Sequence, residues 1–383
     1  MADAPTKSER KSLWPGRFLL PVLVPVTAAL ILLFNLDPFD PARLPAKVLD
    51  GRPIALPRTN ARLLRESEFI GRGSLLAPED IAYDSESGVI YTGCMDGWIK
   101  RVTVREPSAE SLVENWVEVG GRPLGLVVGK NKEVIVAHPD QGLLNISRDG
   151  GEVELLTDEA DGVKFRLTDG VDVAEDGIIY FTDASYKYNF SGFLFDVLEG
   201  RPHGRLLSYD PSTRLTKVLL RDLYFGNGVA VSPDQNSVVF CETVVRRCRK
   251  YHIKGERKGW VDSFVENIPG IPDNVKYDGE GRYWIALSME FTPYWFWDAV
   301  FRYPAIRKVL GILERYHKKP HLEKNGGVLA VDLEGKPTAR YYDPALSLIS
   351  SGIKIGNHLY CGSLANSYLL SFNLTQNPAL AAS

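Results

Sequence analysis

The sequence lacks several features that mark common classes of protein. The formal net charge is only −3 over 383 residues, so no basic excess is available for binding nucleic acid. Four cysteines in a chain of this length are too few for a disulfide-based scaffold. No Gly-x-Ser-x-Gly motif occurs, which leaves a serine esterase without support. Hydrophobic residues are plentiful at 44%, and this composition is typical of a folded globular protein.

One long apolar run lies near the N-terminus. Residues 18–36 include no charged side chain, and basic residues precede them. A membrane-spanning helix needs about 20 apolar residues, and its positive flank stays in the cytosol. We therefore expect a cytosolic tail at 1–17, a transmembrane signal anchor at 18–36 and a linker at 37–62. The alternative is a cleaved signal peptide, whose apolar region is usually shorter, at about 7–15 residues.

Both alternatives place the rest of the chain in the lumen of the endomembrane system or outside the cell. The compartment would be the endoplasmic reticulum, the vacuole or the cell surface. Three Asn-x-Ser/Thr sequons agree with this topology, and they predict a glycoprotein modified at Asn145, Asn189 and Asn373.

Residues 63–383 repeat one pattern six times: a polar tip, a short alternating strand, a turn, and an apolar strand that ends in small residues. The clearest copy is LTDGVDVAEDGIIYFTD at 167–183, and the others begin near residues 78, 122, 226, 272 and 348. A spacing of about 45 residues, where nothing is inserted, suits a blade of four strands. The pattern predicts an all-β, six-bladed β-propeller. The strand near residues 67–75 has no partner in its own blade, so we expect it to close the ring by pairing with the last blade.

Two aromatic insertions, at 184–203 and 290–325, interrupt the repeat. Apolar residues at helical spacing predict a helix over 305–317, with basic residues around them. The insertions are expected to form a cap on the top face of the propeller. A surface that lies on the membrane is the alternative. In both cases they would shape the entrance of a pocket.

The polar tips of the repeats are expected to converge, because the inner strands of a propeller all start around one central channel. The tip residues are Glu79, Asp80, Asp169, Asn227, Asp273 and Asn274. Ca²⁺ takes 6–8 oxygen ligands, and carboxylate and amide oxygens in a ring provide them. We expect a calcium site formed by Glu79, Asp169, Asn227, Asp273 and Asn274. The alternative is that Asp and Asn only begin strands through turn chemistry. The second copy has Leu124 at its tip, and the sixth has only serines.

Cys241 and Cys248 are symmetric about Val244–Val245, the expected tip of a hairpin. Directly opposed strand residues have Cβ atoms about 4.5–5.5 Å apart, and the lumen is oxidising. A disulfide between Cys241 and Cys248 is therefore expected. Cys94 and Cys361 are expected to be buried thiols.

The chain resembles the strictosidine synthase-like proteins of plants and the related adipocyte plasma membrane-associated protein. The resemblance rests on LTDGVDVAEDGIIYFTDAS, EGRPHGRLLSYDPSTR, LLRDLYFGNGVAVSPDQ, CETVVRRCRKY and PGIPDNVKYDGEGRYWIA. More distantly it is similar to paraoxonases, gluconolactonases and regucalcin, which are six-bladed calcium-dependent hydrolases. Their metal motifs correspond to Glu79, Asn227 and Asp273–Asn274 here, and Asp169 stands where they often have Asn.

Two departures from these relatives narrow the function. Strictosidine synthase uses a glutamate in its last blade as acid/base, whereas this chain has no Asp or Glu after Asp343 and has Ser350–Ser351 near that place. A hydroxyl without a partner does not replace a general base, so the synthase condensation is disfavoured. Paraoxonases place a His at the second tip, where this chain has Leu124, so a lactonase that relies on that His is also in doubt.

Three functions follow, in order of preference. The first is a calcium-dependent hydrolase of small esters or lactones, arylesterase-like, in which Asp80, Asp169 or Asp273 accepts a proton from water. The second is a non-catalytic propeller that binds a ligand or acts as a scaffold. The third is the strictosidine synthase-type condensation. The expected partners are a small-molecule substrate and the membrane.

Overall fold

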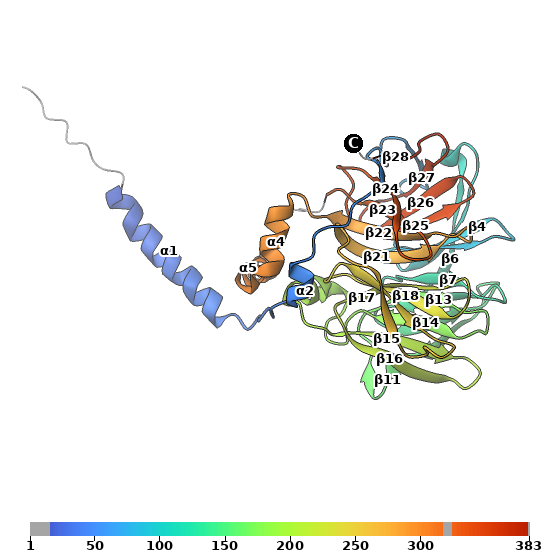
Figure 1. Cartoon of the computed structure of the whole chain (residues 1–383), viewed down its shortest axis with the longest axis horizontal. Coiled ribbons are helices and arrows are strands. Elements are labelled where there is room, and N and C mark those ends of the chain that lie inside the picture. Colours follow the sequence, from blue (N-terminus) through green and yellow to red (C-terminus); the bar gives the residue numbers. More distant parts are fainter. Residues whose placement is uncertain (1–15, 317–323, 382–383) are drawn as a thin grey trace, which may run out of the picture.

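The computed structural model describes residues 16–316 and 324–381, and most of them form six antiparallel sheets arranged around an axis (Figure 1). Each inner strand contacts the inner strand of the next sheet, and the sixth contacts the first. This closed ring confirms the six-bladed β-propeller.

Each blade contains four strands, and in the first five blades they follow one another in the chain. The first two blades are β3 (Ile81–Asp84), β4 (Val89–Gly93), β5 (Trp98–Thr103) and β6 (Leu112–Glu118), then β7 (Leu126–Val128), β8 (Val134–His138), β9 (Gly142–Ile146) and β10 (Val153–Thr157). The third and fourth are β13 (Thr168–Val173), β14 (Ile179–Asp183), β15 (Gly204–Asp210) and β16 (Leu215–Leu223), then β17 (Gly226–Val231), β18 (Ser237–Glu242), β19 (Arg247–His252) and β20 (Val261–Val265). The fifth is β21 (Gly270–Tyr277), β22 (Tyr283–Glu290), β23 (Gly327–Val331) and β24 (Pro337–Tyr342). The sixth is β25 (Ile349–Ile355), β26 (His358–Ser363), β27 (Leu369–Asn373) and β2 (Ser67–Ile70).

The ring is closed by β2, which comes before all of the blades in the chain. It pairs antiparallel with β27, so that Ser67 lies opposite Phe372. This pairing confirms the predicted closure and covers the edge that the last blade would otherwise expose. Two more strands, β1 (Arg58–Asn60) and β28 (Leu380–Ala381), extend the fifth blade beyond β24. Part of the segment expected to be a linker, 37–62, thus belongs to a sheet.

Apolar side chains fill the spaces between neighbouring blades. Between the fourth and fifth blades, for example, Val239, Val275 and Ile285 are fully buried. The second strand of each blade is the most apolar, and every residue of β18 and β22 is buried. Strands buried on both faces appear in the sequence as continuous apolar runs, which is the pattern the repeat showed.

The two insertions form a helical cap. The first contains η2 (Phe190–Gly192) and α3 (Phe193–Glu199), and the second contains α4 (Tyr294–Arg302) and α5 (Pro304–Tyr316). The helix predicted over 305–317 is α5, and residue 317 lies outside the described residues. On the cap helices themselves, Val300 and Phe301 of α4 and Ile312 of α5 are buried, which supports the cap interpretation. Trp295 and Leu313 of the same helices are exposed.

Two helices, α1 (Gly16–Leu36) and α2 (Ala46–Leu49), precede the propeller, and α1 projects away from it (Figure 1). Within the part of the chain that the structure describes, no helix has the length and apolar character needed to cross a membrane. The anchor at 18–36 therefore stays a prediction, and most of the predicted tail at 1–17 lies outside the described residues.

The segment after α1 is fastened to the cap. The Asp37 carboxylate forms an ion pair with Arg315 of α5 at 2.7 Å. The ring of Phe39 packs edge-on against Phe195 of α3, with the ring centroids 5.6 Å apart. The guanidinium of Arg307 donates to the carbonyl of Ala42. The C-terminal end of α1 is thus held beside the cap.

The predicted disulfide is confirmed. Cys241 of β18 lies directly opposite Cys248 of β19, and their sulfur atoms are bonded. Cys94 and Cys361 are buried free thiols, as expected. Smaller elements complete the fold: η1 (Ser108–Glu110), β11 (Glu159–Ala160) and β12 (Val163–Lys164).

Candidate functional site

The polar tips do converge, and a repeated irregularity in the inner strands places them. The pairing register shifts at Thr168/Val171 in β13, at Gly226/Val229 in β17 and at Pro272/Val275 in β21. Each shift is a bulge that includes the tip residue. Bulges re-aim side chains and are frequent beside functional sites. Here they release Asp169, Asn227 and Asp273 from the regular pleat at the same level of three successive blades.

Small residues let the tips come close together. A Cβ added to Gly170 would lie 2.7 Å from the carbonyl oxygen of Asn227, and one added to Gly228 would lie 2.5 Å from the Cα of Asn274. Each tip glycine therefore packs against the backbone of the next tip. Only a residue without a side chain permits this approach, so the glycine after the polar residue is part of what assembles the site.

The converging tips form the floor of a cavity of about 150 Å³. Its polar lining includes Glu79, Asp169, Asn227 and Asp273, which are 2–6% exposed. The walls are apolar and come from the blades and from both insertions. The insertions contribute Phe190, Phe193, Leu194, Val197, Leu198, Trp297, Val300 and Phe301. Sites of this form, apolar with a few convergent polar groups, are typical of small-molecule binding.

Two oxygens at the cavity floor accept no hydrogen bond from any residue that the structure describes. They are Oε2 of Glu79 and Oδ1 of Asn227, and both are buried. The Asp169 carboxylate accepts no hydrogen bond from the described residues, and it faces the same cavity. A buried acceptor without a donor is unfavourable unless a ligand or ion supplies its partner. These carboxylate and amide oxygens therefore fit a hard cation such as Ca²⁺ as their ligand partner.

One observation limits this fit. Within residues 16–316 and 324–381, no three His, Cys, Asp or Glu side chains lie close enough to hold a metal ion by themselves. An ion at the cavity floor would therefore need the amide oxygen of Asn227 together with carboxylates of Glu79, Asp169 or Asp273.

The environment of the cavity floor raises the pKa of its carboxyl groups. Burial, reinforced by the neighbouring carboxylates, raises the pKa of Glu79 and of Asp169 well above the usual range. Burial also raises the pKa of Asp273 to about 7, although a hydrogen bond from the Ser288 hydroxyl opposes the shift. A cation would relieve this repulsion and return the groups to their ionised forms.

Asp80 does not belong to the cavity, contrary to the expectation that it is an acid/base candidate. Its carboxylate forms an ion pair with Lys276 at 2.6 Å and accepts hydrogen bonds from the backbone N–H of Leu126 and from the hydroxyl of Ser351. The group is fully buried. Asp80 does not line the cavity that the neighbouring Glu79 enters. Its partners come from the second, fifth and sixth blades, so its role is to join those blades to the first.

Asn274 also differs from the predicted role of a ligand. Its amide nitrogen donates to Oε1 of Glu79 at 2.9 Å. The side chain does not line the cavity, and it fixes the orientation of Glu79 instead. At the sixth tip, Ser350 donates to the carbonyl oxygen of Glu79 at 2.7 Å. Both residues therefore support the first tip.

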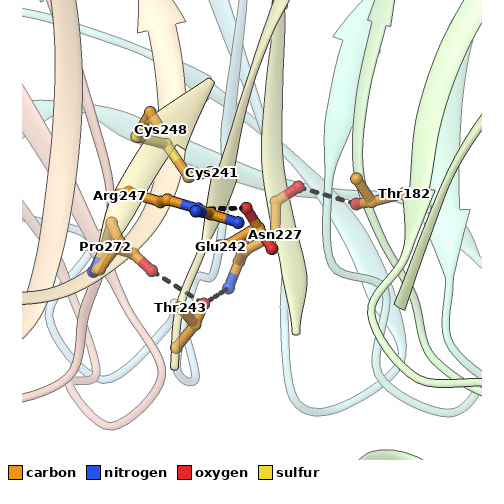
Figure 2. Close-up of a disulfide and its surroundings, with 8 residues drawn as sticks. All are labelled: Thr182, Asn227, Cys241, Glu242, Thr243, Arg247, Cys248 and Pro272. Atoms are coloured by element: carbon orange, nitrogen blue, oxygen red, sulfur yellow. Dashed lines mark hydrogen bonds and ion pairs between the residues drawn. A yellow bond between two sulfur atoms is a disulfide. The ribbon is translucent and has the colours of Figure 1, made fainter. Parts of the chain in front are cut away.

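Asn227 is positioned by two threonines that the sequence did not reveal as part of the site (Figure 2). The hydroxyl of Thr243 accepts from the amide nitrogen of Asn227 at 3.3 Å and donates to the carbonyl of Pro272 at 2.9 Å. The hydroxyl of Thr182 donates to the backbone carbonyl of Asn227 at 2.8 Å. With its nitrogen engaged, Asn227 directs Oδ1 to the cavity. Thr243 follows β18, the strand that carries Cys241.

The other predicted residues lie away from the cavity floor or on its wall. Leu124 is buried and lines the cavity, so the second tip contributes only apolar surface. Of the predicted glycosylation sites, Asn189 is exposed in a loop, whereas Asn145 is half-buried within β9 and Asn373 ends β27. Modification of all three stays a prediction.

The fold and the cavity define a six-bladed propeller with an apolar cavity whose floor is formed by the polar tips of the inner strands. Solved structures with this fold include a gluconolactonase from Xanthomonas campestris, with a TM-score of 0.57, 15% identity, and coverage of 88% of this chain and 99% of that one. Regucalcin from Agrobacterium tumefaciens, described as a calcium-binding protein, has a TM-score of 0.55, 14% identity, and coverage of 86% and 98%. At these identities the likeness shows the fold alone.

Sequence comparison identifies the family. Residues 169–256 match the family described as strictosidine synthase, and residues 59–102 match the N-terminal part of strictosidine synthase-like proteins. Protein strictosidine synthase-like 6 of Arabidopsis thaliana is 53% identical over 94% of this chain and 95% of its own length. The human adipocyte plasma membrane-associated protein is 32% identical over 92% of this chain and 87% of its own length. The chain belongs to the strictosidine synthase-like family.

Proposed function

We propose that this chain is a Ca²⁺-dependent hydrolase of small apolar esters or lactones. The observation that carries the proposal is the cavity floor, where Oε2 of Glu79 and Oδ1 of Asn227 lack donors beneath apolar walls. The names of two fold neighbours, a gluconolactonase and a calcium-binding protein, are consistent with it. Glu79, Asp169, Asn227 and Asp273 would hold the ion, with Asn274 orienting Glu79.

The bound ion would supply Lewis-acid polarisation of a carbonyl oxygen. The chain itself binds the apolar part of the substrate between Phe193, Trp297 and Phe301. Asp169 and Asp273 face the cavity and are the two candidates for accepting a proton from water. Asp80 is not a candidate, because Lys276 neutralises it outside the cavity.

The test is hydrolysis of a panel of aryl esters and lactones by the purified full chain, with Ca²⁺ or with a chelator. We expect turnover that needs Ca²⁺ and is lost in Glu79→Gln and in Asn227→Ala, while both variants remain folded in the chelator. Turnover that survives in the chelator would contradict the metal's role. Asp169→Asn and Asp273→Asn then identify the proton acceptor by which of them removes turnover without removing Ca²⁺ binding.

A non-catalytic ligand-binding or scaffolding propeller is the second candidate. It is favoured by the absence, within the described parts, of three acidic, His or Cys side chains close enough to hold a metal. Ligand binding without turnover of any ester in the panel would support it. The synthase condensation stays disfavoured, because Ser350 and Ser351 are buried. Their hydroxyls donate hydrogen bonds to the backbone carbonyl of Glu79 and to the carboxylate of Asp80.

We further propose that α1 anchors the propeller in an endomembrane, with the cavity on the lumenal side. Large apolar side chains along α1 are exposed, including Leu23, Val24, Ile31, Leu32 and Leu36. Asp37, immediately after α1, forms an ion pair with Arg315 of the cap helix α5. Protease protection in sealed microsomes tests this topology: the propeller should survive until detergent is added, and digestion without detergent would contradict it.

A further inference from the structure

Arg122 is a charged residue at the edge of the cavity to which the proposed function assigns no role. It lies two residues before Leu124, the tip of the second blade. Its Nη2 donates to the carbonyl of Leu364 at 2.8 Å, and its guanidinium lies 4.9 Å from the centre of the Phe190 ring. Leu124, Phe190 and Leu364 all line the cavity. The guanidinium is therefore held where the second blade, the sixth blade and the first insertion meet.

The nearest charge that acts on Arg122 does so without a hydrogen bond. Among the described residues, Glu79 influences the guanidinium only through its charge, and the buried Nε has no hydrogen-bond partner. Burial lowers the pKa of Arg122, and the charge of Glu79 partly opposes this shift. Glu79 thus acts from a distance, and among the N–H groups of the half-buried guanidinium, that of Nε has no acceptor in the described parts of the chain.

The arginines inside this protein fall into two groups. Arg205 forms an ion pair with Asp183 at 2.6 Å, and Arg340 forms one with Glu290 at 2.6 Å. Arg122, like the buried Arg307, donates to a backbone carbonyl instead. A guanidinium with free N–H groups matches the two oxygens of a carboxylate or the oxygens of a phosphate.

We propose that Arg122 binds the anionic head group of an otherwise apolar ligand, whose chain occupies the cavity among Phe193, Trp297 and Phe301. The head group is a carboxylate, a phosphate or a sulfate. This inference deepens the proposed function and rests on the same cavity, since it makes the preferred substrate an amphiphilic acid. Binding is independent of turnover, so the two proposals can fail separately.

The test measures binding of matched ten-carbon ligands to the full chain by calorimetry: decanoate, decyl phosphate, decyl sulfate and the neutral decanol. Wild type should bind at least one of the anions more tightly than decanol. In Arg122→Met that anion should bind about tenfold more weakly or worse, the loss expected for hydrogen bonds to a charged group. Decanol should bind within about twofold of wild type, because only charge recognition is removed.

Arg72→Met is the matched control, because Arg72 also stacks on an aromatic ring, that of Phe69 at 4.2 Å, but it is exposed and Phe69, unlike Phe190, does not line the cavity. It should leave all four affinities unchanged. The ranking of the three anions in wild type identifies the head group. Equal losses for decanol and the anions in Arg122→Met would overturn the proposal, as would a wild type that does not distinguish them. If Arg122→Met does not fold, Arg122→Lys replaces it as the test. This variant keeps the positive charge but loses the paired N–H donors of the guanidinium, and unaltered anion affinity in it would also overturn the proposal.

Discussion

Replacing Asp273 by Asn is expected to stabilise the calcium-free protein at pH 8 and to have little effect at pH 4. The carboxylate is 6% exposed, and burial raises its pKa from 3.8 to about 7. Between these two values the folded state keeps a proton that the unfolded state has released. Stability therefore falls as the pH rises from about 4 to about 7, and above pH 7 the whole penalty is present.

The magnitude follows from the size of the shift. A change from 3.8 to about 7 is about 3 pKa units, and at about 1.4 kcal/mol per unit this gives roughly 4 kcal/mol as an upper limit. Asn is nearly the same shape and carries no charge. Asn still offers an oxygen to the Ser288 hydroxyl, and the pKa of about 7 already includes the opposing effect of that hydrogen bond, so nothing further is subtracted. We expect a gain that approaches roughly 4 kcal/mol at pH 8.

The assay is urea denaturation followed by tryptophan fluorescence, in a chelator, at pH 4 and pH 8. Glu256→Gln, which removes an exposed carboxylate, is the control and should change the free energy of unfolding little at either pH. Added Ca²⁺ should stabilise wild type more than Asp273→Asn at pH 8. A gain that is equal at both pH values, or no gain at pH 8, would show that the buried charge is not what destabilises the empty site.

Three further changes test other parts of the structure. Thr243→Val removes the hydroxyl between Asn227 and the carbonyl of Pro272, so we expect a loss of about 1–3 kcal/mol and weaker Ca²⁺ binding by calorimetry; unchanged affinity would mean that Thr243 does not position Asn227. Lys276→Met leaves the Asp80 carboxylate buried without its ion-pair partner, so the free energy of unfolding at pH 7 should fall by about 3–5 kcal/mol in urea denaturation; an unchanged value would argue against a role of the ion pair in stability. Cys248→Ser opens a short disulfide loop with a sequence separation of 7, which should cost about 2 kcal/mol in urea denaturation, and a reductant should then have no further effect on this variant.

The sequence was sufficient for the architecture because the propeller is local and repetitive. Apart from β2 in the sixth blade, the four strands of each blade come from one stretch of chain, so the alternation of 167–183 and its relatives carries both the strands and their order. Even the closure by β2 could be predicted, since a strand without a partner in its own blade must pair elsewhere. The disulfide between Cys241 and Cys248 followed for the same reason, because both cysteines belong to one hairpin.

The candidate site was only partly predictable. The sequence identified which residue types stand at the tips, and the structure brings Glu79, Asp169, Asn227 and Asp273 to one cavity. The sequence did not identify Thr243 or Ser288 as part of the site, because a single hydroxyl residue in or beside an apolar strand carries no signal of its own. Arg122 was also missed, since nothing in its neighbourhood of the chain shows that its partner is the carbonyl of Leu364, 242 residues away.

The sequence by itself determined that six similar β units form a ring with acidic and amide side chains at the tips. Only the tertiary structure decided which of those side chains face the cavity. Glu79 and Asp80 are chemically alike and adjacent, yet one enters the cavity while the other is bound by Lys276, which is 196 residues away. The direction of a strand side chain depends on the pleat and on bulges, and its state of charge depends on burial and on partners from other blades. Those quantities exist only once the ring has closed.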